Sequence, residues 1–461
     1  MSFDFQQLVI DDAMDAIIDY RGKTPKKSSF GIPLITAKIV KGGSILKPTE
    51  FIPVDNYHSW MVRGLPKVGD VVLTTEAPLG EVAQLSNEKV ALAQRIVTLR
   101  GKKGLLHNDY LLYLLQSSSV QNQLNARATG TTVKGIKQSE LRKVVLNIPA
   151  LKYQKWAAKC LQSLDKKIKN NDRVNQTLEQ MAQALFKSWF VDFEPVKAKM
   201  AVLEIGGSQE EATLAAMTAI SGKNADALMV FEREHPEQYA ELKTTAELFP
   251  SAMQESELGE IPEGWSLGAL SNIAIFANGK VDISSLTPET YVSTENMLEN
   301  RAGISTATSL PSVNSVPSFR NGHVLISNIR PYFKKIWLAR YSGGRSADVL
   351  AFEAQDTVTV EYIYNLLYQE SFFDFMMLTS KGVKMPRGDK TAIMGWQCIC
   401  PDKKIANAFS KAVGKYYSFI EINNIQNKTL TQLRDTLLPK LLSGEITLPE
   451  AKQAVSEVEH V

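Results

Sequence analysis

The spacing of apolar residues predicts two long helices, one in each half of the chain. Apolar side chains recur every three or four residues from about Gln154 to Phe190, and the pattern returns from Phe409 to Leu441. This period gives each helix one apolar stripe, the arrangement that packs helices against each other. The first helix would be about 55 Å long at about 1.5 Å per residue. Its seam positions are Ala157, Leu161, Leu164, Ile168, Asn171, Asn175, Leu178, Ala182, Leu185 and Trp189.

Shorter motifs repeat at the same separation as the two helices. The heptapeptides NQTLEQM at 175–181 and NKTLTQL at 427–433 begin 252 residues apart. Upstream, GDVVLTTEAPL at 69–79 matches GHVLISNIRPY at 322–332, now 253 residues apart, so a single-residue gap intervenes. A nearly constant separation over such a length is not expected by chance, and it predicts a tandem duplication of one unit.

Each unit combines short strands with helices in the same order. Strand-like runs punctuated by Gly and Pro come first, followed by a short amphipathic helix, a polar loop and the long helix. The predicted class is α+β, with two tandem mixed α/β domains separated by the long helices. The predicted boundaries are 1–150 for the first domain, 151–196 for the first long helix, 197–258 for an acidic helical insertion or linker, 259–402 for the second domain, and 403–461 for the second long helix and C-terminal tail.

Asparagines occupy the same two seam positions in both long helices. They are Asn171 and Asn175 in the first helix, and Asn423 and Asn427 in the second. A polar residue inside an apolar seam costs stability but can fix the register of the pairing. We expect the helices to pair as an antiparallel intramolecular coiled coil, with these asparagines near its middle. The alternative is that the asparagines lie on the solvated edge of the stripe.

The stretch between the repeats is strongly acidic. Residues 201–260 contain twelve acidic side chains and only the basic Lys223, Arg233 and Lys243. Such a segment is not expected to touch DNA, and we interpret it as a linker or a docking surface for a protein. A solvated insertion without a role is the competing interpretation.

The composition is that of an ordinary globular protein, without an evident active site. The net charge of +3 permits a polyanionic partner but does not require one. Three cysteines indicate reduced thiols in a cytoplasmic protein, and neither a signal peptide nor a membrane span is expected. No phosphate-binding loop, nucleophile elbow or zinc-protease motif is found, and the five histidines lack metal-ligand spacing. We therefore expect no catalytic residue, no metal and no cofactor bound by this chain.

Three motifs carry a resemblance to a known family. NQTLEQMAQALFKSWFVDFEP at 175–195 and LRDTLLPKLLSGEI at 433–446 resemble the two conserved regions of type I restriction–modification specificity subunits. LGEIPEGW at 258–265 resembles the entry to a target-recognition domain of that family. The resemblance covers nearly the whole chain, although the first domain lacks the Pro-x-Gly-Trp entry and the acidic insertion is longer than a minimal member needs.

The resemblance implies a DNA-binding subunit that is not itself an enzyme. In this family each target-recognition domain reads one half of a split double-stranded DNA sequence, and the paired helices fix the spacer between the halves. Members recruit two modification subunits, which bind S-adenosylmethionine and methylate adenine. A motor–nuclease subunit that uses ATP and Mg²⁺ joins them for restriction.

Two polar loops at equivalent places are candidates for phosphate contacts. The first contains Arg127, Thr131, Thr132, Lys134 and Lys137. The second contains Lys381, Lys384, Arg387 and Lys390. Cations and hydroxyls in a glycine-rich loop suit the DNA backbone. Arg21, Lys23, Lys26, Lys27 and Lys280 are further candidates. Solvated turns are the alternative for all of these residues.

Base readers are expected on the loops that follow the strand-like runs. They are Thr74, Thr75 and Glu76 in the first unit, and Ser327, Asn328, Arg330 and Tyr332 in the second. Arginine can hydrogen-bond to guanine, and asparagine to adenine, in the major groove. Strand-end capping and hydrogen bonding within the protein are the alternative roles.

Two other classes of function stay open at this point. The chain could be a non-catalytic coiled-coil adaptor that binds proteins rather than DNA, in which case its interactions would be insensitive to salt. It could also be an enzyme with an unrecognised site, which turnover by the isolated chain would reveal.

Overall fold

The computed structural model describes residues 5–446 except residues 21, 88, 132 and 258. The chain divides into two compact units, each assembled from distant segments of sequence. Unit 1 consists of Met1–Asp172 and Asn424–Val461, and unit 2 of Arg173–Asn423. Each unit therefore contains part of both long helices. None of the described helices is both long and apolar enough to cross a membrane.

The centre of unit 1 is a four-stranded antiparallel sheet in the order β2-β10-β7-β8. These strands are β2 (Met14–Asp19), β10 (Ile96–Gly101), β7 (Val71–Thr75) and β8 (Leu79–Gln84). Successive residues of a strand face opposite sides, so β7 contributes Val71 and Leu73 to one core and Val72 to the other. Because both faces are covered, β7 is apolar at consecutive positions rather than at alternate ones.

Smaller elements cover the two faces of this sheet. The helix α3 (Asn108–Gln116) buries six consecutive residues from Tyr110 to Leu115. Beyond it lie α4 (Ser118–Arg127), α5 (Gln138–Leu141) and the pair β1 (Gln6–Val9) with β11 (Val145–Ile148). The other face carries β3 (Ile32–Ile35), β6 (Phe51–Ile52) and β9 (Ala91–Leu92). The remaining short elements are α1 (Ile10–Ala13), β4 (Val40–Lys41), β5 (Ser44–Ile45) and α2 (Tyr57–Trp60).

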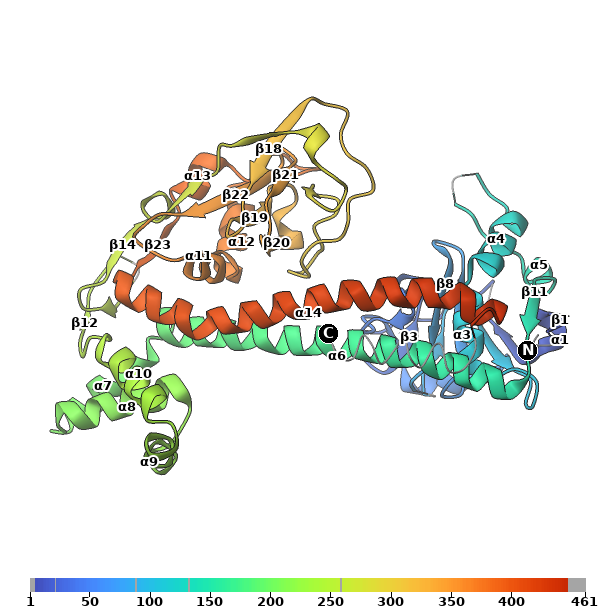
Figure 1. Ribbon diagram of the computed structural model, residues 1–461, viewed down its shortest axis with the longest axis horizontal. Helices are drawn as coiled ribbons and strands as arrows, with labels where there is room; N and C mark the ends of the chain where they lie inside the picture. The colour runs from blue at the N-terminus through green and yellow to red at the C-terminus, as the bar shows by residue number, and fades with distance from the viewer. Residues whose placement is uncertain (1–4, 21, 88, 132, 258, 447–461) are drawn as a thin grey trace. The chain divides into compact units, whose positions relative to one another are not determined.

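Unit 2 repeats the same framework. Its central sheet has the order β15-β22-β19-β20, formed by β15 (Ala274–Phe276), β22 (Val349–Ala354), β19 (Val324–Ser327) and β20 (Ile336–Leu338). The helices α11 (Val360–Leu367), α12 (Glu370–Leu378) and α13 (Lys390–Met394) follow in the order of α3, α4 and α5 (Figure 1). The pair β14 (Ser266–Ala269) with β23 (Gln397–Cys400) corresponds to β1 with β11. The duplication predicted from the sequence is therefore a duplication of structure.

Unit 2 also contains a second four-stranded sheet, formed by β16 (Lys280–Asp282), β18 (Ser315–Phe319), β21 (Gly343–Arg345) and β17 (Tyr291–Val292). Its parallel pair, β17 with β21, corresponds to the parallel pair β3 with β9 in unit 1. Other elements have no equivalent among the described residues of unit 1. A short pair joins β12 (Met253–Gln254) and β13 (Ile261–Pro262). Four helices fill the acidic segment, namely α7 (Glu194–Glu204), α8 (Gln209–Ser221), α9 (Ala225–Glu234) and α10 (Pro236–Glu247) (Figure 1). Lys411 and Glu241, 2.8 Å apart, link α10 to the second long helix.

The two long helices are α6 (Leu151–Phe190) and α14 (Lys403–Ser443), and they run antiparallel in both units. In unit 1 the Tyr153 hydroxyl donates to the Leu441 carbonyl over 2.7 Å, and Arg434 pairs with Asp165 at 3.1 Å. In unit 2 the rings of Phe186 and Phe409 lie 5.7 Å apart. In each case a residue near one end of α6 meets a residue near the opposite end of α14. The predicted antiparallel pairing and the α+β class are thus confirmed.

The seam asparagines bond to one another rather than to solvent alone. In unit 1 the Asn171 amide, 3% exposed, donates to Gln426 over 2.8 Å and to Asn427 over 2.9 Å. In unit 2 the Asn423 amide donates to Asn175 over 2.8 Å. Asn171 and Asn423 are equivalent residues of the two repeats, as are Asn175 and Asn427. Each of the two hydrogen-bonded pairs therefore joins the same two positions, with the helices exchanged. Their role in fixing the register stays a prediction.

The antiparallel pairing predicts which engineered cysteines can be joined. Leu161 and Leu437 are both buried in the core of unit 1. After Cys160, Cys398 and Cys400 are replaced by alanine, L161C with L437C should form a disulfide on mild oxidation, measured by gel shift before and after reduction. The matched pair L161C with V413C should stay reduced. Efficient oxidation of that second pair would indicate parallel helices.

A buried carboxyl group lies where α6 meets α11 in unit 2. Glu179 lies near Gln183 and Tyr364, which both stabilise its charged form, and Arg340 adds a weaker attraction. Burial dominates and raises the pKa of Glu179 to about 7. Its Oε1 atom is buried without a hydrogen-bond partner among the described residues. Ionising this group therefore opposes folding.

The raised pKa of Glu179 predicts how stability changes with pH. Between its ordinary pKa of 4.5 and the folded value of about 7, the folded state binds more protons than the unfolded state. Stability should therefore fall as pH rises through this window, by roughly 3 kcal/mol at most. The variant E179Q should lose this decline in urea unfolding monitored by circular dichroism at pH 5 and pH 8. The exposed control E232Q should keep it, and identical profiles for wild type and E179Q would contradict the argument.

Candidate nucleic-acid interface

Three segments of unit 1 meet at one end of the central sheet. The Thr75 amide, at the end of β7, donates to the Arg95 carbonyl just before β10 over 2.9 Å. The Ile136 amide donates to the Thr75 carbonyl over 3.0 Å, which joins the polar loop to the same strand end. Within this loop Thr129 and Gly135 exchange two backbone hydrogen bonds of 2.8 and 2.9 Å. We call this arrangement junction 1 and define it as residues 74–76, 94–95 and 129–137, of which residue 132 lies outside the described part of the chain.

The same backbone arrangement recurs in unit 2. The Asn328 amide donates to the Asp348 carbonyl over 2.8 Å, and the Gly388 amide donates to the Asn328 carbonyl over 3.2 Å. Lys381 and Arg387 exchange two bonds of 2.9 and 3.0 Å. Every one of these residues lies 252 or 253 positions after its counterpart in unit 1. We call this arrangement junction 2 and define it as residues 327–330, 347–348 and 381–388.

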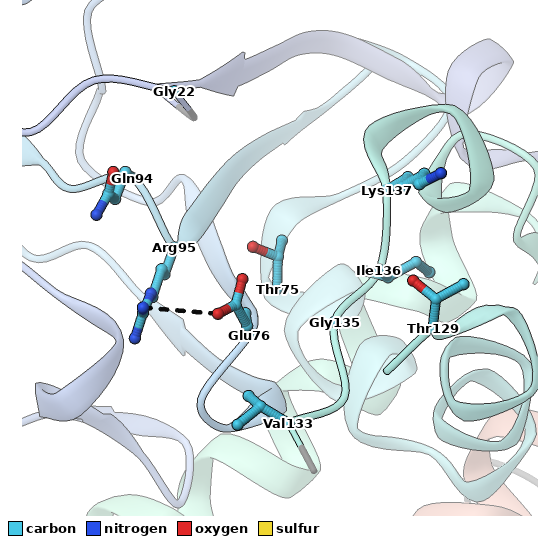
Figure 2. Close-up of a pocket in the computed structure, with 10 residues that line it drawn as sticks. All are labelled: Gly22, Thr75, Glu76, Gln94, Arg95, Thr129, Val133, Gly135, Ile136 and Lys137. Carbon is cyan, nitrogen blue, oxygen red and sulfur yellow. Dashed lines mark ion pairs between the residues drawn. The ribbon is translucent and has the colours of Figure 1, made fainter. Parts of the chain in front are cut away.

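Junction 1 opens into a cavity of about 540 Å³. Figure 2 shows the side chains that line it, including Glu76 and Lys137, two of the candidates from the sequence. Gln94 and Arg95 also line it, although no motif in the sequence had pointed to them. Arg95 and Glu76 form an ion pair with a nitrogen–oxygen distance of 3.6 Å and remain 51% and 45% exposed. The concave surface therefore presents donors and acceptors together.

Several of the expected base readers are buried. Thr74 is fully buried, and its hydroxyl accepts a hydrogen bond from the Glu81 amide at 2.9 Å. Thr75 is 2% exposed. The Ser327 hydroxyl donates to the Ile329 carbonyl at 3.1 Å, and the Asn328 amide group donates to the Gly388 carbonyl at 3.1 Å. This geometry favours the alternative role, hydrogen bonding within the protein at the strand ends.

Other expected base readers are accessible. Arg330 is exposed. Its backbone is left-handed, with a φ of 49°, a conformation that residues other than glycine seldom adopt. Its amide donates to the Pro386 carbonyl over 2.8 Å, which holds it beside the loop of junction 2. Ala77 takes the same conformation in unit 1, with a φ of 53°. Tyr332, 47% exposed, follows Arg330 in a short 3-10 turn.

The cationic candidates are mostly exposed. Thr131, Lys134 and Lys137 are exposed in the loop of junction 1, whereas Arg127 is half-buried at the end of α4. In unit 2, Lys384, Arg387 and Lys390 are exposed. Lys381 lies 2.6 Å from Asp389, and this hydrogen bond raises the pKa of the lysine.

The remaining candidates lie apart from the loops. Lys23 and Lys26 are exposed, and Lys27 pairs with Glu50 at 2.9 Å. Gly22, at the start of this turn, lines the cavity of junction 1. Lys280 is exposed on β16, outside the central sheet. Arg21 and Thr132 lie outside the described residues.

Within the described part of the chain, no group of three or more His, Cys, Asp or Glu side chains could hold a metal ion. The arrangement offers hydrogen-bonding groups and exposed charge at equivalent places in two repeats. Groups of these kinds are the ones that proteins use to contact DNA phosphates and base edges.

Comparisons with known proteins agree with this interpretation. The family model for the type I restriction modification DNA specificity domain matches residues 22–180. The specificity subunit of the type I restriction enzyme HindI from Haemophilus influenzae is 29% identical over 409 residues, which cover 82% of this chain and 87% of that protein. Over most of its length the chain is similar to type I restriction–modification specificity subunits. Such subunits are not catalytic, and the enzymatic activities of the complex reside on partner subunits.

Further similar proteins also match over most of this chain. The MjaIX specificity subunit of Methanocaldococcus jannaschii is 24% identical over 403 residues, covering 84% of this chain and 80% of that one. The crystal structure of an S subunit from M. genitalium matches with a TM-score of 0.48 and 15% identity, over 95% of this chain and 96% of that one.

The loop of junction 1 depends on one glycine. Gly130 has a φ of 106°, and a Cβ atom there would lie 2.2 Å from the Val133 carbonyl oxygen. The variant G130A should strain this loop by about 1–3 kcal/mol. Tryptic cleavage after Lys134, followed by mass spectrometry, should then accelerate about tenfold. The control G104A has a similar φ of 82° but meets nothing within 4 Å, and it should leave that rate unchanged. Equal rates for wild type and G130A would show that the loop does not need its glycine.

Proposed function

We propose that the two repeats of this specificity subunit read the two halves of a split double-stranded DNA target. The observation that supports this proposal is the recurrence of the same backbone junction in both units with different side chains on it. The same backbone arrangement with two different sets of side chains suits the recognition of two different sequences on similar faces of a duplex. In this proposal residues 1–150 and 259–402 are the target-recognition domains, joined by the long helices at 151–196 and 403–461.

The paired helices would set the number of base pairs between the two half-sites. α6 contains 40 residues, or about 60 Å at about 1.5 Å per residue, and one turn of DNA is about 34 Å. A seam with polar layers at fixed positions resists sliding, because a shifted amide would lose its partner. The asparagines at 171, 175, 423 and 427 would therefore determine the spacing of the target.

The partners that we propose are two modification subunits and, for restriction, motor–nuclease subunits. S-adenosylmethionine, ATP and Mg²⁺ would bind to those subunits rather than to this chain. Phe419 and Ile422 on α14 are 58% and 59% exposed, which makes them candidates for a protein contact. Because the target is the DNA of the cell, the complex would act in the cytoplasm.

The contacts to DNA would divide into two kinds. Arg330 in junction 2, Tyr332 next to it, and Glu76 in junction 1 have accessible groups that suit base edges. Lys134, Lys137, Lys384 and Lys390 would bind phosphates and hold the duplex without reading it. The turn with Lys23, Lys26 and Lys27, together with Lys280, would add to these backbone contacts.

The proposed function can be tested by expressing the chain together with its modification subunits. Sequencing of methylated adenines in the host DNA should then reveal one two-part motif with a fixed spacer. Modification without any such motif would refute the proposal. A chain that binds proteins, retains no DNA and does not respond to salt would instead be an adaptor.

The variant R330A tests one base reader of this specificity subunit. Alanine fits this backbone, because Ala77 occupies the equivalent position with a similar φ. In a binding assay with duplexes of varied sequence, R330A should lose about 1–3 kcal/mol of discrimination at one base pair of the second half-site. The control K384A should weaken binding to all duplexes alike and reduce the salt slope by about one. Uniform weakening by R330A as well would assign Arg330 to a phosphate.

A further inference from the structure

Equivalent positions of the two junctions carry opposite charges. Arg95 and Asp348 are at equivalent positions of the two repeats. The Thr75 amide donates to the Arg95 carbonyl over 2.9 Å, and the Asn328 amide donates to the Asp348 carbonyl over 2.8 Å. Each forms an ion pair across its junction: Arg95 with Glu76 at 3.6 Å, and Asp348 with Arg387 at 3.2 Å. Each junction thus contains one ion pair, with opposite charges at the equivalent positions 95 and 348, whereas the partners come from different segments: Glu76 follows β7, and Arg387 belongs to the polar loop.

The two ion pairs are accessible and easily opened. In junction 1 the side chains are 51% and 45% exposed, and in junction 2 the exposed fractions are 53% for Arg387 and 37% for Asp348. Exposed ion pairs contribute little to stability, since water screens the charges and the side chains lose freedom. Both partners can therefore exchange their ionic contact for another hydrogen-bonding partner at small cost.

A G·C base pair has the complementary groups at a matching separation. In the major groove guanine presents the acceptors O6 and N7, and cytosine presents the N4 donor. Guanine O6 and cytosine N4 are bonded to each other, so they lie about 2.9 Å apart. The paired nitrogen and oxygen atoms of each junction are separated by a similar distance, 3.6 or 3.2 Å. An arginine and a carboxylate held side by side can thus meet both bases of one pair.

We propose that each ion pair reads a single G·C base pair, with the arginine on guanine and the carboxylate on cytosine. This inference rests on the proposed function. In unit 1 the arginine stands at the start of a central strand, whereas in unit 2 the carboxylate stands there. The guanine of the first half-site therefore lies on the side of β10, and the cytosine of the second lies on the side of β22.

The test uses the full chain in complex with its modification subunits. Duplexes with randomised half-sites are bound at one salt concentration, and the retained sequences are determined. R95A and E76A should each lower the preference for G·C at the same base pair of the first half-site, about tenfold. R387A and D348A should do so at one base pair of the second half-site. R95K should also lose the preference while keeping its affinity for unrelated DNA, because lysine retains the charge but not the planar fork.

Arg142 provides the matched control. It is a half-buried arginine of unit 1 that pairs with Asp11 outside junction 1, so R142A removes the same charge without touching the proposed reader. R142A should leave the selected sequence unchanged. The inference is overturned if R95A and E76A act on different base pairs, weaken all sequences alike, or change nothing. Failure of the wild-type complex to select any two-part sequence would refute the proposed function itself, and this inference with it.

Discussion

Reciprocal hydrogen bonds between amide side chains of α6 and α14 are the constraint that both units of this protein share. Asn171 with Asn427 in unit 1, and Asn423 with Asn175 in unit 2, are bonded inside an otherwise apolar seam. Apolar side chains tolerate sliding by a turn, but a poorly solvated amide that loses its partner is costly. Each helix begins three residues after the last strand of its repeat, β11 or β23. The last strand of each repeat is therefore coupled closely to one of the long helices.

The two repeats have polar contacts at equivalent positions but form them with different residue types. In unit 1 the Tyr113 hydroxyl donates to Asp165 over 2.6 Å, which docks α3 onto α6. The equivalent bond in unit 2 runs from the Asn365 amide to the Tyr417 hydroxyl over 2.8 Å and docks α11 onto α14. Both bonds hold the first helix of a recognition domain on the long helix that follows it. What the fold requires is a polar contact at that point, and different side chains can supply it.

The sequence predicted the framework well because motifs repeated at a nearly constant separation indicate the same elements in both halves of the chain. The apolar period gave the helices, and the reciprocal asparagines gave their antiparallel pairing. It failed where burial decides the role of a polar residue: β7 extends through Thr75, so Thr74 and Thr75 are still within the sheet. Arg95 and Asp348 were missed for a related reason. Each lies far in sequence from its ionic partner, and only strand pairing brings the charges together.

A junction built from backbone hydrogen bonds leaves its side chains free to differ. The amides and carbonyls that join Thr75, Arg95 and Ile136 do not depend on side-chain identity, so substitution at position 95 leaves the frame intact. A homodimer would carry the same change in both halves, since its interface and its sites are identical by symmetry. Here each repeat has its own sequence, and Arg95 of the first repeat corresponds to Asp348 of the second. Under the proposed function, a single chain could therefore alter the reading of one half of its target and leave the other half unchanged.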